Sequence, residues 1–215
     1  MKKNYISNSS DSIRMFSNNL LESLSKVHFS VPLFIYLPVI GYFSFKAFNN
    51  GISLLLFSGW LLAGIAVWTI TEYFLHRYIF HFEPGSVWGR RLHFIFHGVH
   101  HDYPKDAKRL VMPPSASIPL ATGFYFLFAL FLKTKIYLFA FFPGFLVGYL
   151  VYDMMHYAMH HYNFKSELMK KVKKHHMLHH YNDSTRGYGV STAIWDVILR
   201  SDFPKKQSHE PAHQG

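Results

Sequence analysis

The sequence predicts an all-α integral membrane protein, with about four transmembrane helices in two hairpins beneath a cytoplasmic helical cap. Three observations lead to this prediction. Half of the 215 residues are hydrophobic, and the chain contains four long apolar runs. Of the 22 lysines and arginines, 19 lie outside these runs and their short connectors. The chain also has 16 histidines, most of them clustered in the polar segments that carry this positive charge.

The apolar runs cover residues 31–48, 52–70, 118–132 and 136–152. About 20 helical residues cross a bilayer core of about 30 Å. The first two runs satisfy this length, whereas the last two are marginal and fit either tilted helices or a shallower hairpin. Short polar connectors join the runs pairwise into two hairpins. A soluble protein with buried core helices is the alternative, but four such runs leave little sequence for a polar shell.

The lysines and arginines set the expected orientation. Only Lys46, Lys133 and Lys135 lie at the connectors, and the other 19 lie on the two terminal segments and the middle loop. Because cytoplasmic loops carry the excess of positive charge, both termini are expected in the cytoplasm, in a bacterial inner membrane or the endoplasmic reticulum. The net charge of +10 does not predict nucleic-acid binding, because the charges avoid the apolar runs rather than line one basic face.

The chain is expected to divide into an N-terminal tail at 1–30, a membrane domain at 31–200 and a disordered tail at 201–215. Apolar residues recur at helical spacing within 13–27. This pattern predicts a helix that lies in the membrane interface or, equally well, packs on the cytoplasmic domain.

The cap is expected to contain three helical segments. The first carries residues 93–101 and ends at the Asp-Tyr-Pro sequence that follows. The second covers 153–183, with a break near 162–164. The third is a short helix at 194–199, after a glycine-containing turn.

Four histidine clusters are the most informative feature of the cap. Residues three or four apart share a helix face, so the imidazoles of one cluster can aim at one point. Imidazole is the usual nitrogen ligand of zinc, copper, iron and nickel. One tetrahedral zinc needs about four ligands, so ten imidazoles indicate two metal ions. The ten candidate ligands are His76, His81, His97, His100, His101, His156, His160, His176, His179 and His180.

Few carboxylates accompany these histidines. Glu72 and Asp153 are expected to accept the free imidazole N–H of a ligand, although each is equally well explained as a charge at a helix terminus. Two histidines and one carboxylate hold the iron of many oxygenases, and this pattern does not fit the histidine count. A zinc hydrolase would need far fewer imidazoles. The chain has no cysteine, which excludes thiolate metal sites and disulfides.

The location of the clusters narrows the substrate. A metal pair at the mouth of a transmembrane bundle can receive a long-chain lipid whose tail lies in an apolar sleeve, formed largely by 118–132 and 136–152. An unactivated C–H bond has no proton that a side-chain base can remove. Oxygen activated at a redox metal can break such a bond, and the cofactor carries that chemistry. The carbon nearest the metals is then expected to lie close to the polar head of the lipid.

The chain resembles the membrane fatty acid hydroxylase superfamily, which includes sterol desaturases and carotenoid hydroxylases. The histidine spacing carries the resemblance, over roughly residues 50–200. Further strings resemble the branch of fatty acid 2-hydroxylases that act on sphingolipid acyl chains. These strings are Glu-Tyr-Phe-Leu-His-Arg at 72–77, His-Phe-Ile-Phe-His-Gly-Val-His-His at 93–101, Arg-Leu-Val-Met-Pro-Pro at 109–114, Gly-Tyr-Gly-Val at 187–190 and Trp-Asp at 195–196.

The resemblance implies an O2-dependent enzyme that hydroxylates a long fatty acyl chain, free or in a sphingolipid or ceramide, at the 2-position. It implies two iron ions, which zinc can replace, held by the ten histidines. His93, His161 and His175 flank the clusters and are expected in supporting or surface positions, as is Asp183. The chain is expected to differ from fungal and animal members in lacking a fused b-type cytochrome domain, and a separate redox protein is expected to donate electrons.

Three alternatives remain open at this stage. A sterol- or carotenoid-type hydroxylase, or a desaturase, would use the same histidine pattern. A metal transporter or sensor is a non-enzymatic alternative, although transporters place their ligands near the bilayer midplane rather than at one edge. A structural zinc protein without turnover is the third.

Overall fold

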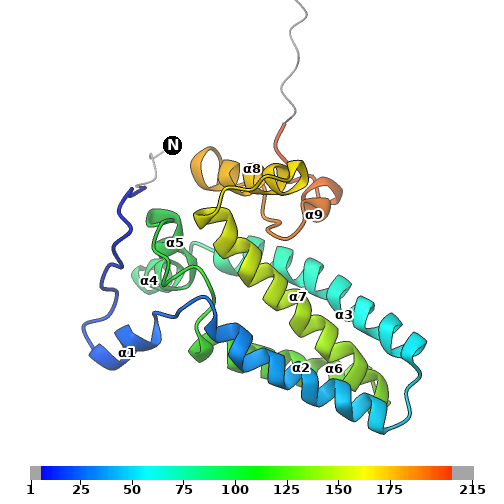
Figure 1. Cartoon of the computed structure of the whole chain (residues 1–215). Helices are drawn as coiled ribbons and strands as arrows, with labels where there is room; N and C mark the ends of the chain where they lie inside the picture. Colours follow the sequence, from blue (N-terminus) through cyan, green and yellow to red (C-terminus); the bar gives the residue numbers. More distant parts are fainter. Residues whose placement is uncertain (1–5, 205–215) are drawn as a thin grey trace, which may run out of the picture.

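The computed structural model describes residues 6–204, and within this range every element is a helix (Figure 1). Four helices have the length and composition to cross a membrane. The all-α membrane fold is therefore confirmed. The spanning helices are α2 (Val31–Asn49), α3 (Leu54–Phe74), α6 (Pro114–Phe131) and α7 (Lys135–His161).

Helix α7 is the centre of the bundle and lies between α2 and α3 (Figure 1). The two predicted hairpins are present in the chain order, but α2 and α3 each pack against α7 more than against each other. Glycines allow the close approach of α3 and α7. A Cβ on Gly64 would collide with the Phe141 carbonyl, and one on Gly144 with the Leu61 carbonyl. Small residues of this kind bring the backbones of membrane helices together.

Two of the spanning helices are longer than the hydrocarbon core of a bilayer is thick. Helix α3 continues directly into a π-helical turn, η1 (Leu75–Phe80), which gives a rod of 27 residues, and α7 also has 27 residues. At 1.5 Å per residue each rod is about 40 Å long, against about 30 Å for the bilayer core. The fourth apolar run, which looked marginal for a span, is therefore part of a longer helix. His76 lies on the last turns of the first rod, and His156 and His160 lie on the last turns of the second.

The cap is built from the remaining helices (Figure 1). Three elements form a continuous helical stretch through the predicted 93–101 region and end at Asp102: α4 (Val87–His93), η2 (Phe94–Gly98) and α5 (Val99–Asp102). Helix α8 (Glu167–Tyr181) follows the predicted break after α7, and α9 (Ile194–Ile198) is the predicted last short helix.

The N-terminal segment differs from its prediction. Only α1 (Asn19–Leu24) is helical within 13–27. The Asn18 side chain caps this helix, and the Glu22 carboxylate accepts the backbone N–H groups of Met15 and Phe16. These bonds hold the preceding residues in a non-helical conformation, so the long amphipathic helix does not form.

The C-terminal boundary also differs slightly from its prediction. Ser201, which was assigned to the tail, is buried, and its hydroxyl contacts the Tyr73 hydroxyl (2.7 Å) and the Asp196 carboxylate (2.8 Å). Packing against the domain therefore includes this residue. The rest of the predicted tail from 205 onward lies outside the described residues.

Candidate metal centre

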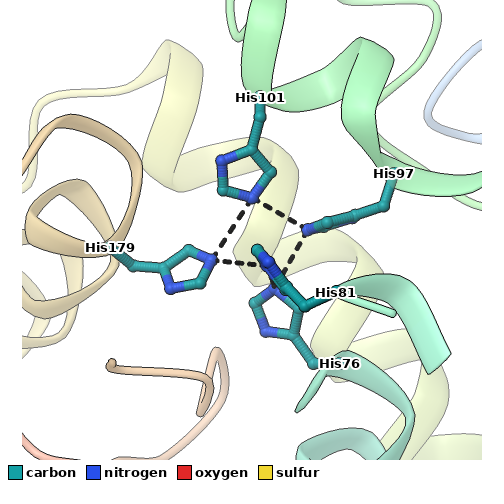
Figure 2. A group of neighbouring side chains, drawn as sticks. All are labelled: His76, His81, His97, His101 and His179. Atoms are coloured by element: carbon teal, nitrogen blue, oxygen red, sulfur yellow. Dashed lines mark hydrogen bonds between the residues drawn. The ribbon is translucent and has the colours of Figure 1, made fainter. Parts of the chain in front are cut away.

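The ten candidate histidines converge in two groups of five, and the ligand atoms of each group lie within 4.8 Å of one another. Figure 2 shows the first of them, group A, with its rings pointing toward one another. Group A consists of His76, His81, His97, His101 and His179, and group B consists of His100, His156, His160, His176 and His180.

In group A the Nε2 atoms form a tight cluster (Figure 2). His76 Nε2 lies 3.0 Å from His97 Nε2 and 3.2 Å from His81 Nε2. His101 Nε2 lies 3.0 Å from His97 Nε2. His179 closes the cluster from α8, with its Nε2 at 2.9 Å from His81 and 3.3 Å from His101.

Group B has the same character with a different set of helices. His156 Nε2 lies 2.8 Å from His100 Nε2, which joins α7 to α5. His176 Nε2 lies 2.9 Å from His160 Nε2 and 3.1 Å from His180 Nε2, which joins α8 to α7. Four of these five residues are buried, and His160 is half-buried.

The clusters in the sequence do not correspond one to one with the groups in space. The expectation that His97, His100 and His101 aim at one point is wrong, because His97 and His101 belong to group A and His100 to group B. Helix α8 is divided in the same way, with His179 in group A. Adjacent residues on a helix point about 100° apart, so a His-His pair reaches two neighbouring points rather than one.

The pairing of His76 with His81 depends on the π-helical turn. Residues five apart on an α-helix point about 140° away from each other. His76 lies within η1 and His81 is its C-terminal cap, and the wider turn brings the two rings to a centroid distance of 4.9 Å. π-Bulges are rare and occur frequently at functional sites.

Backbone carbonyl groups orient three of the imidazoles. The Nδ1 atom of His76 bonds to the Tyr188 carbonyl at 2.5 Å, and that of His179 to the Arg186 carbonyl at 2.6 Å. In group B, His156 Nδ1 bonds to the Leu110 carbonyl at 3.0 Å. Since a carbonyl only accepts, each Nδ1 carries the proton and each Nε2 presents a lone pair to its group.

The electrostatics keep these imidazoles neutral. Burial lowers the pKa of His179 to about 4, against the opposing effect of its hydrogen bond to the Arg186 carbonyl. Burial and the neighbouring imidazoles also lower the pKa of His97, His100 and His180 well below the ordinary value. Neutral imidazole is the form that binds a metal ion.

The donor set fits a metal ion in each group. Lone pairs that face each other at about 3 Å repel unless a cation lies between them. Two nitrogens that bind one ion at about 2.1 Å and at right angles lie about 3.0 Å apart, which agrees with the 2.8–3.3 Å separations. The five nitrogens of each group would hold the ion, and the ion would supply the redox chemistry at the site.

The two carboxylates singled out from the sequence have other partners than imidazole. Both Glu72 oxygens accept bonds from the loop after α8, one from the N–H groups of Val190 and Ser191 and the other from the Ser191 hydroxyl. Glu72 therefore fixes the loop whose Tyr188 carbonyl holds His76, rather than His76 itself. Asp153 accepts the Met112 N–H at 3.4 Å.

The other flanking residues lie around the groups. His93 pairs with Glu83 at 3.3 Å, and His161 is exposed beside Tyr157, with the ring centroids 4.6 Å apart. Asp183 accepts the Thr185 N–H in the turn that leads to Arg186.

Asp196 is a supporting residue that the sequence analysis did not single out as one. It is fully buried and accepts bonds from the N–H groups of Tyr188 and Gly189 and from His175 Nε2 at 3.1 Å. It thus fixes the same loop as Glu72, at the two residues that precede those held by Glu72. The Trp-Asp string at 195–196 contains this residue and marks it as part of the family resemblance. The sequence alone does not show which groups the Asp196 carboxylate would bond.

An apolar pocket of about 750 Å³ reaches both groups. His97 of group A and His100 and His156 of group B form its inner end. Helix α6 lines one wall as far as Leu127, whereas α7 contributes only its last turns from Tyr152. The expected sleeve is therefore formed by α6, η1 and the N-terminal segment more than by the fourth apolar run.

These features define a class: integral membrane proteins with two all-histidine metal-binding groups at the end of an apolar lipid-sized pocket. The chain belongs to the fatty acid hydroxylase family, whose model matches residues 61–201. It is an oxidoreductase of this family, and the family match does not favour the transport, sensor and structural alternatives.

Several relatives agree with this placement. The chain is 36% identical to the dihydroceramide fatty acyl 2-hydroxylase FAH1 of Arabidopsis thaliana, over 86% of this chain and 78% of that protein. It is 35% identical to the rat (Rattus norvegicus) fatty acid 2-hydroxylase, over 90% of this chain and 58% of that protein. The solved structure of full-length scs7p, in which only the hydroxylase domain is visible, matches with a TM-score of 0.82 and 36% identity, over 88% of this chain and 72% of that chain.

Proposed function

We propose that the protein inserts oxygen at the 2-position of a long fatty acyl chain, most directly one carried by a dihydroceramide or related sphingolipid. The observation that carries this proposal is the apolar pocket that ends at His97, His100 and His156. The names of the relatives supply the substrate class and the position.

The ten histidines of groups A and B are the proposed ligands of two iron ions, which zinc can replace because it binds nitrogen sites more strongly than ferrous iron. When bound, the iron pair supplies the activation of O2 that a C–H bond requires. One oxygen atom enters the C–H bond and the other leaves as water, which takes up two electrons from an external donor and two protons. The protein positions the acyl chain and excludes water with apolar walls.

The position of the new hydroxyl follows from where the histidines lie. His76, His156 and His160 lie at the ends of rods longer than the bilayer core, and the other histidines join them from the cap. The polar head of a lipid therefore remains near the histidines while its tail follows α6 into the membrane. The carbon that reaches the histidines is therefore one next to the head.

Fragmentation mass spectrometry of lipids from cells with and without the protein tests this function. The expected result is a gain of one oxygen on the second acyl carbon. A hydroxyl or a double bond in the middle of the chain would contradict the proposed position and leave only the family.

The metal and the donor need their own test. Protein loaded with iron under reducing, anaerobic conditions is expected to hold two ions and to turn over only with O2 and an added redox protein. Zinc-loaded protein is expected to hold two ions without turnover. One ion per chain in both preparations would contradict the assignment of two groups.

The orientation is proposed from the charge distribution, with both termini in the cytoplasm. Reporter insertions after Lys26 and Arg109 are expected to read cytoplasmic, and one at Lys135 is expected to read the opposite side. A cytoplasmic signal at Lys135 would show that α6 and α7 do not both cross the membrane.

A further inference from the structure

The N-terminal segment at residues 15–25 forms one wall of the pocket. This wall contains no histidine ligand. Met15, Phe16, Leu21, Leu24 and Ser25 all line it. Leu21 and Leu24 are also about half exposed. The segment precedes the residues matched by the family model, which begin at 61.

The wall lies at the end of the pocket where the histidines are. The Ser115 hydroxyl at the start of α6 donates to the Leu24 carbonyl at 3.3 Å, whereas Leu127 lines the pocket three turns further along the same helix. An acyl tail that follows α6 toward Leu127 therefore leaves its polar end beside the N-terminal segment.

Arg109 fastens this wall to the cap. Its Nη2 donates to the Glu22 carboxylate (2.8 Å) and to the Ile13 carbonyl (2.6 Å), and its Nη1 donates to the Ser25 hydroxyl (2.8 Å). Its Nε lies 3.3 Å from the Asp106 carboxylate, and its side chain is 2% exposed. A guanidinium with these contacts fixes both the segment and the loop in one geometry.

The loop held by Arg109 is the one that orients a histidine of group B. The next residue, Leu110, presents its carbonyl to His156 Nδ1. Met112, two residues further, donates its N–H to Asp153 on α7. Two consecutive residues, Arg109 and Leu110, thus connect the N-terminal wall of the pocket to His156 of group B.

We propose that the apolar side chains of residues 15–25 pack against the sphingoid base at the head end of the acyl substrate, and that Arg109 is the positioning residue that sets this wall relative to His156. The inference rests on the proposed function. It assigns recognition of the head of the lipid to the N-terminal segment and recognition of chain length to α6.

Three tryptophan substitutions test the division. Leu24→Trp is expected to lower kcat/KM about tenfold for a dihydroceramide with a full-length sphingoid base, mainly through KM, and less than threefold for one with a truncated base. Leu127→Trp is expected to discriminate by acyl length instead. Leu20→Trp is the matched control, because Leu20 is on the same short helix and does not line the pocket.

Equal losses on both bases in Leu24→Trp, or kinetics like those of Leu20→Trp, would overturn the proposal. Leu21→Trp repeats the test at a second wall position if Leu24→Trp yields no folded protein. Wild-type protein that hydroxylates neither lipid would refute the proposed function itself, which separates the two failures.

Arg109→Ala tests the fastening. The expected result is faster amide hydrogen exchange at residues 15–25 and a KM at least about tenfold higher, with two metal ions retained. The control is Lys26→Ala, which removes the other cation from Glu22 (2.7 Å) and leaves the Arg109 contacts in place. Loss of metal with unchanged exchange at 15–25 would show that Arg109 supports only His156, and would overturn its role in the wall.

Discussion

Groups A and B have the same ligand chemistry but are supported by opposite ends of the chain. In group A, His76 and His179 bond to carbonyls of the C-terminal loop at 186–190, which Glu72 of α3 and Asp196 of α9 hold in place. In group B, His156 bonds to a loop that Arg109 ties to the N-terminal segment. Each group of histidines therefore has its own supporting loop, and a substitution in one loop should affect the metal site of one group only.

The largest expected effect comes from removing one ligand on each side of this comparison. His179→Ala and His100→Ala are each expected to abolish hydroxylation, because both ions are needed for turnover. Elemental analysis should show one ion retained in each variant, in the unaffected group. His161→Ala, at an exposed histidine outside both groups, should keep two ions and full activity. Loss of both ions in either variant would show that the groups are not separable.

A smaller effect is expected from Asp196→Asn. The amide keeps the size of the carboxylate but presents one acceptor oxygen where two accept bonds from Tyr188, Gly189 and His175. Supporting contacts of this kind change metal affinity by about 10–100-fold. Chelator titration should show one ion released earlier and the other as in wild type. An equal loss of affinity for both ions would show that this loop does not support group A alone.

Glu72→Gln tests the other end of the same loop. The glutamine oxygen can keep the two N–H bonds from Val190 and Ser191, but its NH2 group cannot accept from the Ser191 hydroxyl, so this part-buried donor loses its acceptor. We expect a loss of about 1–3 kcal/mol in the free energy of unfolding, measured by thermal denaturation of metal-loaded protein. A stability equal to that of wild type would show that the loop rearranges at no cost.

The smallest effect is the acid response of the N-terminal side. Burial alone would raise the pKa of Glu22, but hydrogen bonds from Lys26, Phe16 and Met15 and the charge of Arg109 lower it to about 2. The ionised carboxylate therefore stabilises the segment above its unfolded pKa of about 4.3, and this stabilisation is lost as the pH falls toward 2. The protection of the amides at residues 15–25 against hydrogen exchange, corrected for the intrinsic rate at each pH, should fall over this range in wild type. Glu22→Gln should show low protection already at neutral pH and little further change.

The sequence predicted the spans and the ten histidines because both are local signals. Apolar length marks a span, and clustered imidazoles mark a metal site. The assignment of each histidine to a group was not predictable in this way. His81 joins His76 only through a π-helical turn, and α-helical spacing gives no indication of it.

Long-range contacts account for the other differences. The position of α7 between α2 and α3 depends on glycines such as Gly64 and Gly144, which meet the backbone of a distant helix. The short α1 depends on Glu22, whose partners include Arg109, 87 residues away. A periodicity analysis of residues 13–27 contains no information about that partner.

Two of the four His-His pairs in the chain set the spacing between groups A and B. His100 and His101 lie on α5 with ring centroids 5.8 Å apart, and His179 and His180 lie on α8 with centroids 5.7 Å apart. In each pair one ring serves group A and its neighbour serves group B. The distance between the two groups is therefore set by the distance between consecutive residues of one helix. It should change little when the bilayer thickness changes or when the helices of the bundle move. A residue inserted between the two histidines of either pair would change the distance between groups A and B, even with every imidazole retained.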